Sequence, residues 1–278
     1  MENKRFNGKA IYQPSGKAKE YSEWACNFYT GCSNDCDYCY CKRGIMSPVW
    51  DKKPHLKKCF VNPKHAIEVF CRELDACAEF IGEKGLLFSF TTDPLLPETR
   101  DLTFEAMEEA LLLNIPVKIL TKRSDWLDEF LRRTEIEKSL YGKIRSLIAF
   151  GFTLTGADEL ESGASTNNER IEAMKKLHDM GFKTFASIEP VIDPHKSSDM
   201  MYQTLGFCDL YKIGLISGKG KEFYDKSVVF KFFEWLKELS SMGYKIYPKD
   251  SLLAYVEIDR SNLDGYFVNA DYTIFEHE

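Results

Sequence analysis

The sequence predicts an α/β fold, a partial (β/α)6 barrel with parallel strands, a short N-terminal extension and a C-terminal cap. Compact apolar runs of strand length alternate with helical stretches along most of the chain. These runs are nearly continuous, as in parallel strands that are buried on both faces. Of the 278 residues, 44% are apolar and 14% aromatic, which supplies a large core and excludes a mainly disordered chain.

In the first half of the chain, short apolar runs predict the strands, and apolar residues recurring every three or four positions predict the helices. Pro63 favours a helix start, because its missing N–H costs nothing in the first turn. In order, the expected elements are strand 24–29, helix 63–81, strand 86–90, helix 102–113, strand 117–120 and a helix capped by Ser124 or Asp125.

The second half repeats the pattern. Gly181 ends one helix, because glycine readily adopts the left-handed conformation that terminates helices. In order, the expected elements are strand 147–153, helix 168–180, strand 183–188, helix 198–205, strand 210–213 and helix 228–239.

Six such units with right-handed crossovers would let the sheet curl into a partial or complete TIM-like barrel. A doubly wound sheet is the competing architecture. No linker or repeat divides the chain, so we expect a single domain with an extension at 1–22, a barrel at 23–243 and a cap at 244–278. The last segment is rich in Tyr, Phe and Ile without a helical period.

Charge and cysteine content limit the cellular compartment and the kind of cysteine site that the protein can have. The start MENKRF lacks an apolar signal region, and no run of about 20 uncharged apolar residues occurs, so we expect a cytoplasmic protein without a membrane span. Cytosolic thiols stay reduced, so the nine cysteines are not a disulfide framework. The net charge of −6 conceals a basic front, since residues 1–64 carry 12 Lys or Arg against 6 Asp or Glu. This front either steers an anionic substrate or is simply a solvated surface.

The segment GCSNDCDYCY places Cys32, Cys36 and Cys39 in one loop with C-x3-C-x2-C spacing. Three thiolates can hold one iron-sulfur cube and leave its fourth iron open to a small chelating molecule. A zinc site is the alternative, with Cys26 or Cys41 as the fourth ligand that tetrahedral zinc requires. A simple electron-transfer cluster would normally require four cysteines.

This motif resembles that of the radical S-adenosylmethionine superfamily. Its flanks, IYQPSGKAKEY at 11–21 and NFYTGCSNDCDYCY at 27–40, resemble the branch related to spore photoproduct lyase. The resemblance implies a 4Fe-4S cluster whose unique iron binds S-adenosyl-L-methionine. It also implies reductive cleavage to methionine and a 5'-deoxyadenosyl radical that abstracts hydrogen from a substrate, with a flavodoxin- or ferredoxin-type electron donor as partner.

Ligands of parallel α/β folds gather at the carboxyl ends of the strands. By resemblance, TTDP at 91–94 would contact the amino group of S-adenosylmethionine, although Asp-Pro is also a common turn. Lys122 would meet its carboxylate as a point charge and Arg170 would meet it bidentately, with a solvated loop lysine and a surface ion pair as the alternatives. Glu189 would need a partner such as Arg170 or Lys122. The hydroxyls of Thr153 and Thr155 suit the ribose or carboxylate, and Gly214 would let the backbone approach the adenine. The candidate cofactor-binding residues are Tyr38, Thr91, Thr92, Asp93, Lys122, Thr153, Arg170 and Glu189.

The substrate is open at this level. A nucleic acid or nucleotide, with a DNA-lesion lyase-like reaction, fits the basic front, and a peptide or small molecule is the alternative. Spore photoproduct lyase uses a cysteine hydrogen donor in the strand before its Asp, whereas LLFSFTTDP at 86–94 has none. A second class of hypothesis is a non-catalytic, zinc-stabilised binding module.

Overall fold

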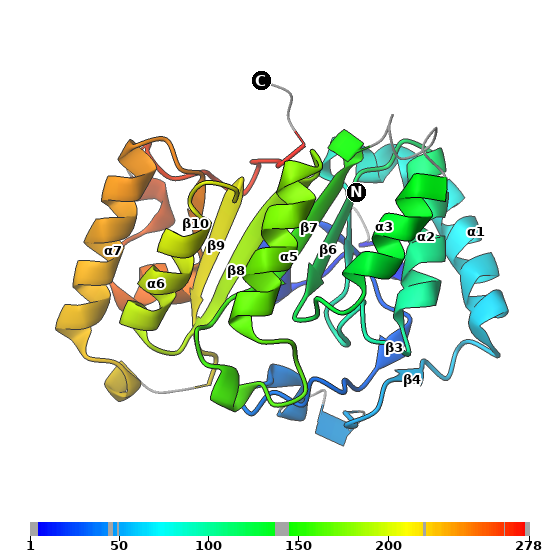
Figure 1. Cartoon of the computed structure of the whole chain (residues 1–278), viewed down its shortest axis with the longest axis horizontal. Coiled ribbons are helices and arrows are strands. Elements are labelled where there is room, and N and C mark those ends of the chain that lie inside the picture. The colour runs from blue at the N-terminus through cyan, green and yellow to red at the C-terminus, as the bar shows by residue number, and fades with distance from the viewer. Residues whose placement is uncertain are drawn as a thin grey trace.

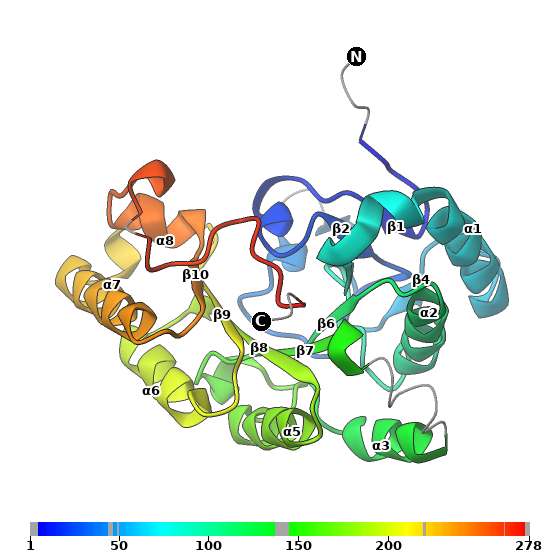
Figure 2. The same cartoon turned by 90° about the horizontal axis from the view of Figure 1, so that it is seen from above.

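The computed structural model describes residues 5–43, 47–48, 50–136, 145–218, 221–263 and 265–275. Its main sheet has eight strands in the order β1-β2-β5-β6-β7-β8-β9-β10. All neighbours are parallel except β1, which is antiparallel to β2. The sheet curls with helices on its outer side, and β10 and β1 stay unpaired with each other (Figures 1 and 2). The predicted partial barrel is confirmed, and a doubly wound sheet is excluded.

The bounds of the elements agree closely with the sequence expectations. The strands are β1 Ile11–Tyr12, β2 Trp24–Cys26, β3 Tyr29–Thr30, β4 His55–Leu56, β5 Leu86–Phe88, β6 Val117–Thr121, β7 Ile148–Thr153, β8 Lys183–Val191, β9 Leu210–Leu215 and β10 Ile246–Pro248. The α-helices are α1 Pro63–Ile81, α2 Arg100–Leu112, α3 Leu127–Ile136, α5 Asn167–Asp179, α6 Pro194–Thr204, α7 Lys226–Ser241 and α8 Asp250–Tyr255. Short 3-10 helices include η1 Gly16–Glu20 and η6 Asp158–Leu160.

Helix starts are fixed by side-chain caps that satisfy otherwise unpaired backbone N–H groups. The Asn62 side chain accepts from the N–H of His65 at the start of α1. Thr166 and Glu169 form a reciprocal capping box at the start of α5, which orients this helix beside the end of β7. None of the helices among the described residues combines the length and apolar character needed to cross a membrane.

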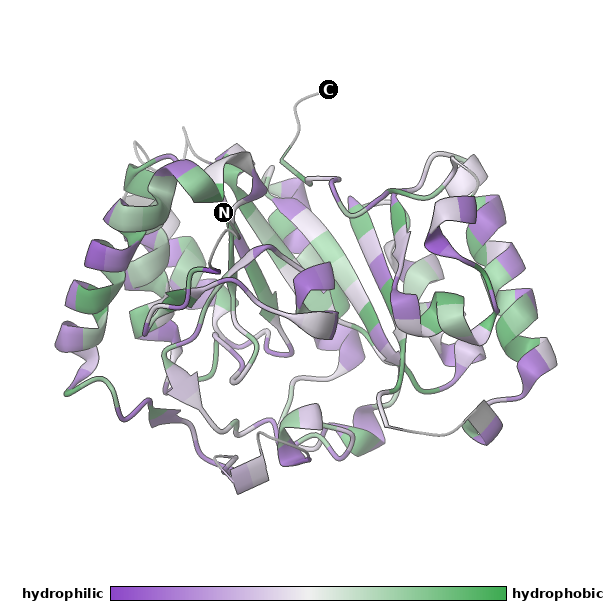
Figure 3. Cartoon of the chain, turned by 180° about the vertical axis from the view of Figure 1, so that it is seen from behind, coloured by the Kyte–Doolittle hydropathy of each residue, from purple (hydrophilic) through white to green (hydrophobic). Residues whose placement is uncertain are grey.

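The two faces of the sheet differ in character. The outer face forms the main core with the helices, where Trp126 of the β6–α3 loop stacks on Phe150 of β7 at 5.2 Å between ring centroids. The inner face carries a smaller apolar cluster of Ala25, Leu87, Ala149, Phe185, Leu210, Ile274 and Phe275. Figure 3, seen from behind, shows strands with hydrophobic and paler or hydrophilic bands, between flanking helices that alternate in hydropathy along their length. The barrel interior is therefore partly polar, because few apolar side chains fill it.

The expected C-terminal cap is only partly correct. Residues 246–248 form β10, a seventh parallel strand paired with β9, and α8 follows directly. A strand of three residues that ends on proline gives no alternation to detect, which explains why the sequence did not indicate it. Beyond α8 the tail does cover an end of the barrel. Thr273 and Phe275 line a hollow with Pro116 and Leu147, which precede β6 and β7, so this is the amino end of the strands.

The unpaired side of the sheet is bridged by residues 16–22, which we call the N-terminal strap. Its η1 helix buries no residue. The contacts to the far side of the barrel are polar, including a hydrogen bond of 2.6 Å from Lys212 Nζ to the Glu20 carbonyl. Figure 2 shows this blue segment and the red C-terminal tail crossing the gap between β2 and β10.

Candidate functional site

The three cysteines of the motif lie on a loop that follows β3 at the carboxyl end of the parallel strands, at the lower edge of Figure 1. Gly31 precedes the loop with a φ of +80°, a region that favours glycine. A Cβ there would stand 2.3 Å from the Lys53 carbonyl oxygen. The backbone of 51–53 therefore packs directly on the loop, and the Cys32 N–H donates to the Asp51 carbonyl at 2.9 Å.

The end of β5 holds this loop in place. Thr91 Oγ1 donates to the Tyr29 carbonyl and Thr92 Oγ1 to the Gly31 carbonyl, each at 2.7 Å. These hydroxyls thus bind the backbone that leads into Cys32. Their protons are committed to the protein, so the two threonines can meet a bound molecule only as acceptors.

Asp93 connects the loop to the end of β6. Its carboxylate accepts from Asn34 Nδ2, Thr121 Oγ1 and the Lys122 N–H, each at 2.7 Å, and from the Leu95 N–H at 3.0 Å. Such an acceptor-only carboxylate with four donors is fully engaged. The structure therefore places Asp93 as a positioning group between the loop and two strands.

Asn34 lies between Cys32 and Cys36 and is 2% exposed. Its Nδ2 is bound to Asp93, whereas its Oδ1 is buried with no hydrogen-bond partner among the described residues. Buried acceptors are normally paired, so this oxygen requires a donor. A donor from a bound ligand, such as an amino group, would satisfy it.

A second set of contacts fixes the other side of the loop through the segment after β7. Tyr38 Oη and Arg170 Nη2 both donate to the fully buried Glu161 carboxylate. Lys122 Nζ lies 3.8 Å from Glu161 Oε1 and 5.0 Å from the Tyr38 ring centroid. The cysteine loop, the β6 end and the 158–166 segment therefore meet at one carboxylate.

Arg170 is completely buried. Its Nη1 donates to the Thr153 carbonyl at 2.6 Å and its Nε to the Ser165 carbonyl at 2.8 Å. With Nη2 on Glu161, every nitrogen of this guanidinium has a protein partner. The expectation that Arg170 binds the cofactor carboxylate through both terminal nitrogens does not fit this geometry. Thr153 enters the network through its carbonyl, not its hydroxyl.

The electrostatics of the loop are set by burial and by near neighbours. Burial, with the nearby Asp93 carboxylate, raises the pKa of Cys32 to about 12. A hydrogen bond from Cys41 lowers the pKa of Cys39 to about 6, against the opposing effect of burial. Burial lowers the pKa of Lys122, but Tyr38, Cys36 and Glu161 outweigh it and raise this pKa well above its usual value. Lys122 is therefore an ammonium at neutral pH.

Glu189 belongs to a different cluster. Its Oε2 accepts from Lys249 Nζ at 2.7 Å and from Tyr21 Oη at 2.5 Å, and Tyr21 Oη also lies 2.6 Å from Ser187 Oγ. The expected pairing of Glu189 with Arg170 or Lys122 is wrong. That expectation overlooked Lys249, because this lysine follows a strand that the sequence did not reveal.

Four residues of these networks, Asn34, Glu161, Tyr21 and Lys249, had no role in the sequence expectations. Asn34 lies inside the motif, and Glu161 lies in the block ELESG at 159–163, where Arg170 drew the attention. The sequence signal that could have indicated Glu161 was its acidic side chain a few positions before the basic Arg170. No comparable signal marked Tyr21, whose partners are more than 160 residues away.

The three thiols can be compared with the ligand sets of a cluster and of a single ion. Among the described residues, no group of three or more His, Cys, Asp or Glu side chains is placed to hold one metal ion. A tetrahedral zinc ion would need four ligands at one point, with Cys26 or Cys41 as the fourth. In a cube each thiolate binds a separate iron, which suits three thiols spread along a short loop. Asn34 Oδ1 adds a buried acceptor beside them.

Comparison with known proteins agrees with this reading. The chain matches the radical SAM superfamily over residues 26–208, which include all three motif cysteines and the ends of β5, β6, β7 and β8. The chain belongs to the radical SAM superfamily. Members of this superfamily use a 4Fe-4S cluster and S-adenosyl-L-methionine, and these are the cofactors of this protein.

Individual proteins are more distant. The chain is 25% identical over 239 residues to uncharacterized protein ORF301 of Acidianus two-tailed virus, covering 80% of this chain and 74% of that one. It is also 25% identical over 246 residues to uncharacterized protein MJ0683 of Methanocaldococcus jannaschii, covering 81% and 75%.

Among solved structures, Streptococcus suis SuiB aligns at 12% identity and a TM-score of 0.49, covering 88% of this chain and 52% of SuiB. SuiB bound to its precursor peptide SuiA aligns at 14% and 0.49, covering 85% and 53%. SuiB bound to S-adenosylmethionine aligns at 14% and 0.44, covering 74% and 46%. The chain thus spans about half the length of these solved chains.

Proposed function

We propose that Cys32, Cys36 and Cys39 ligate the 4Fe-4S cluster and that the protein acts on a nucleotide or nucleic-acid substrate. The observation that carries the cluster assignment is the fixed position of the cysteine loop. It is anchored to the carboxyl ends of β5 and β6 by Thr91, Thr92 and Asp93 and to the segment after β7 by Glu161. Sites of parallel α/β barrels lie at this end.

When bound, the cluster and S-adenosylmethionine supply reductive cleavage of the sulfonium and a 5'-deoxyadenosyl radical for hydrogen abstraction. The chain contributes position and charge. Lys122, held as an ammonium beside Glu161, can attract the cofactor carboxylate. Asn34 Oδ1 can accept from the cofactor amino group. Thr91, Thr92, Asp93 and Arg170 hold the loops in place, and we assign them as positioning residues.

The remaining expected residues take revised roles. Tyr38, bound to Glu161 and facing Lys122, shields one side of the cysteine loop. Thr153 serves through its carbonyl as the support for Arg170. Glu189 reaches the interior from the end of β8 with Tyr21 and Lys249. We assign this second cluster to substrate binding, because its groups contact the N-terminal strap and not the cysteine loop.

We infer the substrate class from the exposed residues beside the cysteine loop. Tyr40 follows the last cysteine and is 54% exposed, which leaves its ring open for stacking on a base. Arg43 and Lys53 are exposed near it in sequence, within the basic front of the chain. Asp35 pairs with both Lys42 and Lys52 at 2.6 and 2.7 Å, so these three residues together leave about one positive charge for phosphates.

The resemblance of residues 27–40 to the branch related to spore photoproduct lyase is the ground on which we propose a lyase-like reaction on a nucleic-acid lesion. Residues 86–94 contain no cysteine donor, and Ser89, which follows β5, donates its hydroxyl to the Thr92 carbonyl. Repair of the spore photoproduct itself is therefore not proposed. A flavodoxin or ferredoxin is the proposed source of the electron.

The test is anaerobic reconstitution with iron and sulfide, followed by reduction with dithionite in the presence of S-adenosylmethionine. We expect formation of 5'-deoxyadenosine, its loss in Cys36→Ala, and its retention in Cys71→Ala, a partly buried cysteine of α1 outside the motif. A reconstituted cluster without cleavage contradicts the radical chemistry. Adding lesion-bearing oligonucleotides, mononucleotides or peptides then identifies the substrate, and stimulation by peptides alone would reject the nucleotide assignment.

A further inference from the structure

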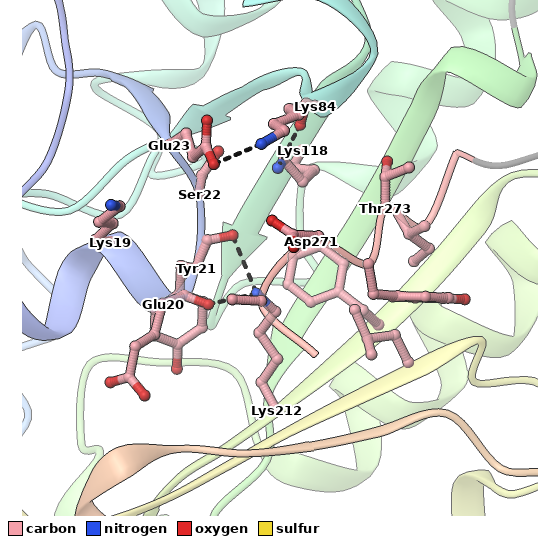
Figure 4. A pocket seen from close by; sticks show the side chains of 15 residues that line it. Lys19, Glu20, Tyr21, Ser22, Glu23, Lys84, Lys118, Lys212, Asp271 and Thr273 are labelled. Atoms are coloured by element: carbon pink, nitrogen blue, oxygen red, sulfur yellow. Dashed lines mark hydrogen bonds and ion pairs between the residues drawn. The ribbon is translucent and has the colours of Figure 1, made fainter. Parts of the chain in front are cut away.

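A small cleft opens between the N-terminal strap and the C-terminal tail, on the side of the barrel opposite the cysteine loop. Residues 19–23 form one wall and residues 270–274 the other. Its volume is about 50 Å³, and it reaches inward to Lys118 of β6 and Lys212 of β9 (Figure 4). We call this feature the lateral cleft. It lies outside the site described above and no step of the proposed function uses it.

Lys118 and Lys212 point into the barrel from two different strands. Their inner-face neighbours Ala149, Phe185 and Leu210 are apolar and buried. The two ammonium groups are near enough for their charges to repel, which adds to the cost of burial. Burial of a charge in such surroundings is unfavourable unless the charge is compensated.

Compensation by the protein is incomplete. Lys118 Nζ donates to the Lys84 carbonyl at 2.7 Å, and Lys212 Nζ donates to the Glu20 and Tyr21 carbonyls at 2.6 and 3.1 Å. In the part of the chain that the structure describes, neither ammonium forms a salt bridge with a carboxylate within 4.0 Å. Backbone carbonyls supply partial charge only, and burial lowers the pKa of Lys118 to about 8 and that of Lys212 well below its usual value. A bound anion would favour the protonated form of both lysines.

Two of the three acidic residues that line the cleft are engaged elsewhere. Glu23 binds Lys84 at 2.6 Å, and Glu20 turns toward Arg260 and Lys249 at 3.6 and 3.7 Å. The dashed lines in Figure 4 show the Glu23–Lys84 pair and the carbonyl contacts of the two inner lysines. The cleft therefore combines two inward lysines with one acidic wall residue, Asp271, that has no ion pair among the described residues.

An ammonium has three N–H donors. Lys118 uses one and Lys212 two in contacts with described residues. When both lysines are protonated, three of their donors have no hydrogen-bond partner among the described residues, although Lys212 Nζ also lies 5.4 and 5.3 Å from the Tyr21 and Tyr247 ring centroids. This geometry suits one small anion with several acceptor oxygens, because charge-assisted hydrogen bonds to oxyanions are the strong ones.

We propose that the lateral cleft binds a small oxyanion of the phosphate type between Lys118 and Lys212. The cleft volume is far below the range of about 300 to 1,000 Å³ typical of sites for larger organic ligands. A nucleoside does not fit inside it, so the ligand is free phosphate or a similar oxyanion. The bound anion would connect β6, β9 and the N-terminal strap, since Lys212 holds the Glu20 and Tyr21 carbonyls.

The test titrates the full chain with inorganic phosphate at constant ionic strength, using chloride as the balancing salt. Calorimetry and the shift in melting temperature both report binding. We expect saturable binding in the unmodified protein, and affinity weaker by about tenfold or more in Lys118→Met and Lys212→Met. Lys231→Met, an exposed lysine on α7, is the matched control and should bind as the unmodified protein does.

A second measurement needs no variant. Phosphate should protect Lys118 and Lys212, but not Lys231, from an amine-acylating reagent, as read by mass spectrometry of the peptides. Adenosine monophosphate should bind no more tightly than inorganic phosphate. Equal melting shifts in all four proteins, absence of protection, or clearly tighter binding of the nucleotide would each overturn the proposal. None of these readouts depends on cleavage of S-adenosylmethionine.

Discussion

At the scale of single residues, the buried Glu161 carboxylate is the group on which most of the candidate site depends. It receives hydrogen bonds from Tyr38 and Arg170 and faces Lys122 at 3.8 Å. A carboxylate with no solvent contact is tolerated only while such partners remain. The same three contacts keep the cysteine loop beside the β6 end, so stability and function share one residue here.

Removing the guanidinium should therefore be costly. We expect Arg170→Met to lower the free energy of unfolding by about 3 to 5 kcal/mol, because it leaves the Glu161 charge buried with fewer partners. Urea unfolding of the protein without cluster measures this change. The double variant with Glu161→Gln should lose less than the sum of the two single variants.

The control is an exposed ion pair close to the same segment. Lys196 and Glu159 are 3.0 Å apart, with side chains 45% and 62% exposed. Lys196→Met should change the free energy of unfolding by less than about 1 kcal/mol. Similar losses for Arg170→Met and Lys196→Met would contradict the role given to the buried pair.

Arg170 illustrates which contacts of a single residue can be predicted from the sequence. The resemblance implied that this arginine meets the carboxylate of the cofactor, whereas in the structure it binds the carboxylate of Glu161 of the chain itself. The spacing of nine residues gives no hint of this, because Glu161 directly follows η6, Arg170 lies in the first turn of α5, and the loop between them brings the two side chains together. The three cysteines could be found from sequence since their chemistry requires their spacing, whereas buried partners follow from tertiary packing.

Lys118 provides a pH-dependent test at the same scale. Burial lowers its pKa from 10.5 to about 8, with nearby Lys84 adding to the shift and Glu23 opposing it. Between about pH 8 and 10.5 the unfolded chain keeps this proton while the folded protein releases it, so stability gains from this group as pH rises. Below pH 8 both states are protonated and the full penalty of burial remains.

Lys118→Met should consequently be more stable than the unmodified protein at pH 7, and this advantage should shrink as pH approaches 10.5. Denaturant unfolding in phosphate-free buffer at several pH values measures the free energy of unfolding of both proteins. The titration of the groups that both proteins share cancels in the difference between them. A difference that stays constant from pH 7 to 10.5 would show that Lys118 has an ordinary pKa.

At the scale of elements, the end of β5 acts as an anchor for the cysteine loop. Its threonine hydroxyls bind the backbone before Cys32, and Asp93 binds Asn34 within the loop and the end of β6. That this strand end belongs to the site, and that TTDP contacts the cofactor, stay predictions. The hydrogen bonds support a positioning role for Asp93, whose carboxylate is fully engaged, while the two threonine oxygens can still accept from a bound group.

We expect Asp93→Asn to fold but to bind less iron on reconstitution. The substitution replaces a charged acceptor by an amide that also presents donors to the Lys122 N–H and Thr121, at a cost of about 2 kcal/mol or more in the free energy of unfolding. Iron and sulfide analysis per chain measures cluster loading. Asp199→Asn, an exposed position on α6, is the control, and equal iron content in both variants would remove the positioning role.

The length of an element decides whether its sequence pattern predicts it. Helix α1 was predicted over its full range, because 19 residues carry several turns of an apolar stripe and begin with a proline. In contrast, β10 has three residues and α8 has six, too few to display a period. Short elements are identified through their neighbours, here the pairing of β10 with β9.

At the scale of the whole molecule, the sheet is left open between β1 and β10, and polar contacts rather than strand pairing close it. The N-terminal strap is held by Glu20, which accepts from the Asp250 N–H at 2.7 Å and faces Lys249 and Arg260. Tyr21 adds its contacts with Ser187 and Glu189. The sequence indicated coverage by a C-terminal cap and gave the N-terminal extension no part in closure, because the contacts span up to 230 residues.

The closure consists mainly of hydrogen bonds and ion pairs, over a helix that buries no residue, with Tyr21 as the one strap side chain packed on the inner apolar cluster. We therefore expect it to open without unfolding the barrel. We expect Glu20→Ala to increase amide hydrogen exchange in peptides covering residues 13–23 by about tenfold or more, while peptides from α7 stay unchanged. Glu257→Ala is the matched control, since it removes an exposed ion pair with Lys226 at 3.2 Å. If Glu20→Ala raised exchange equally in the strap and in α7, the strap would be part of the cooperative core, and access to the Tyr21, Glu189 and Lys249 cluster would require global unfolding.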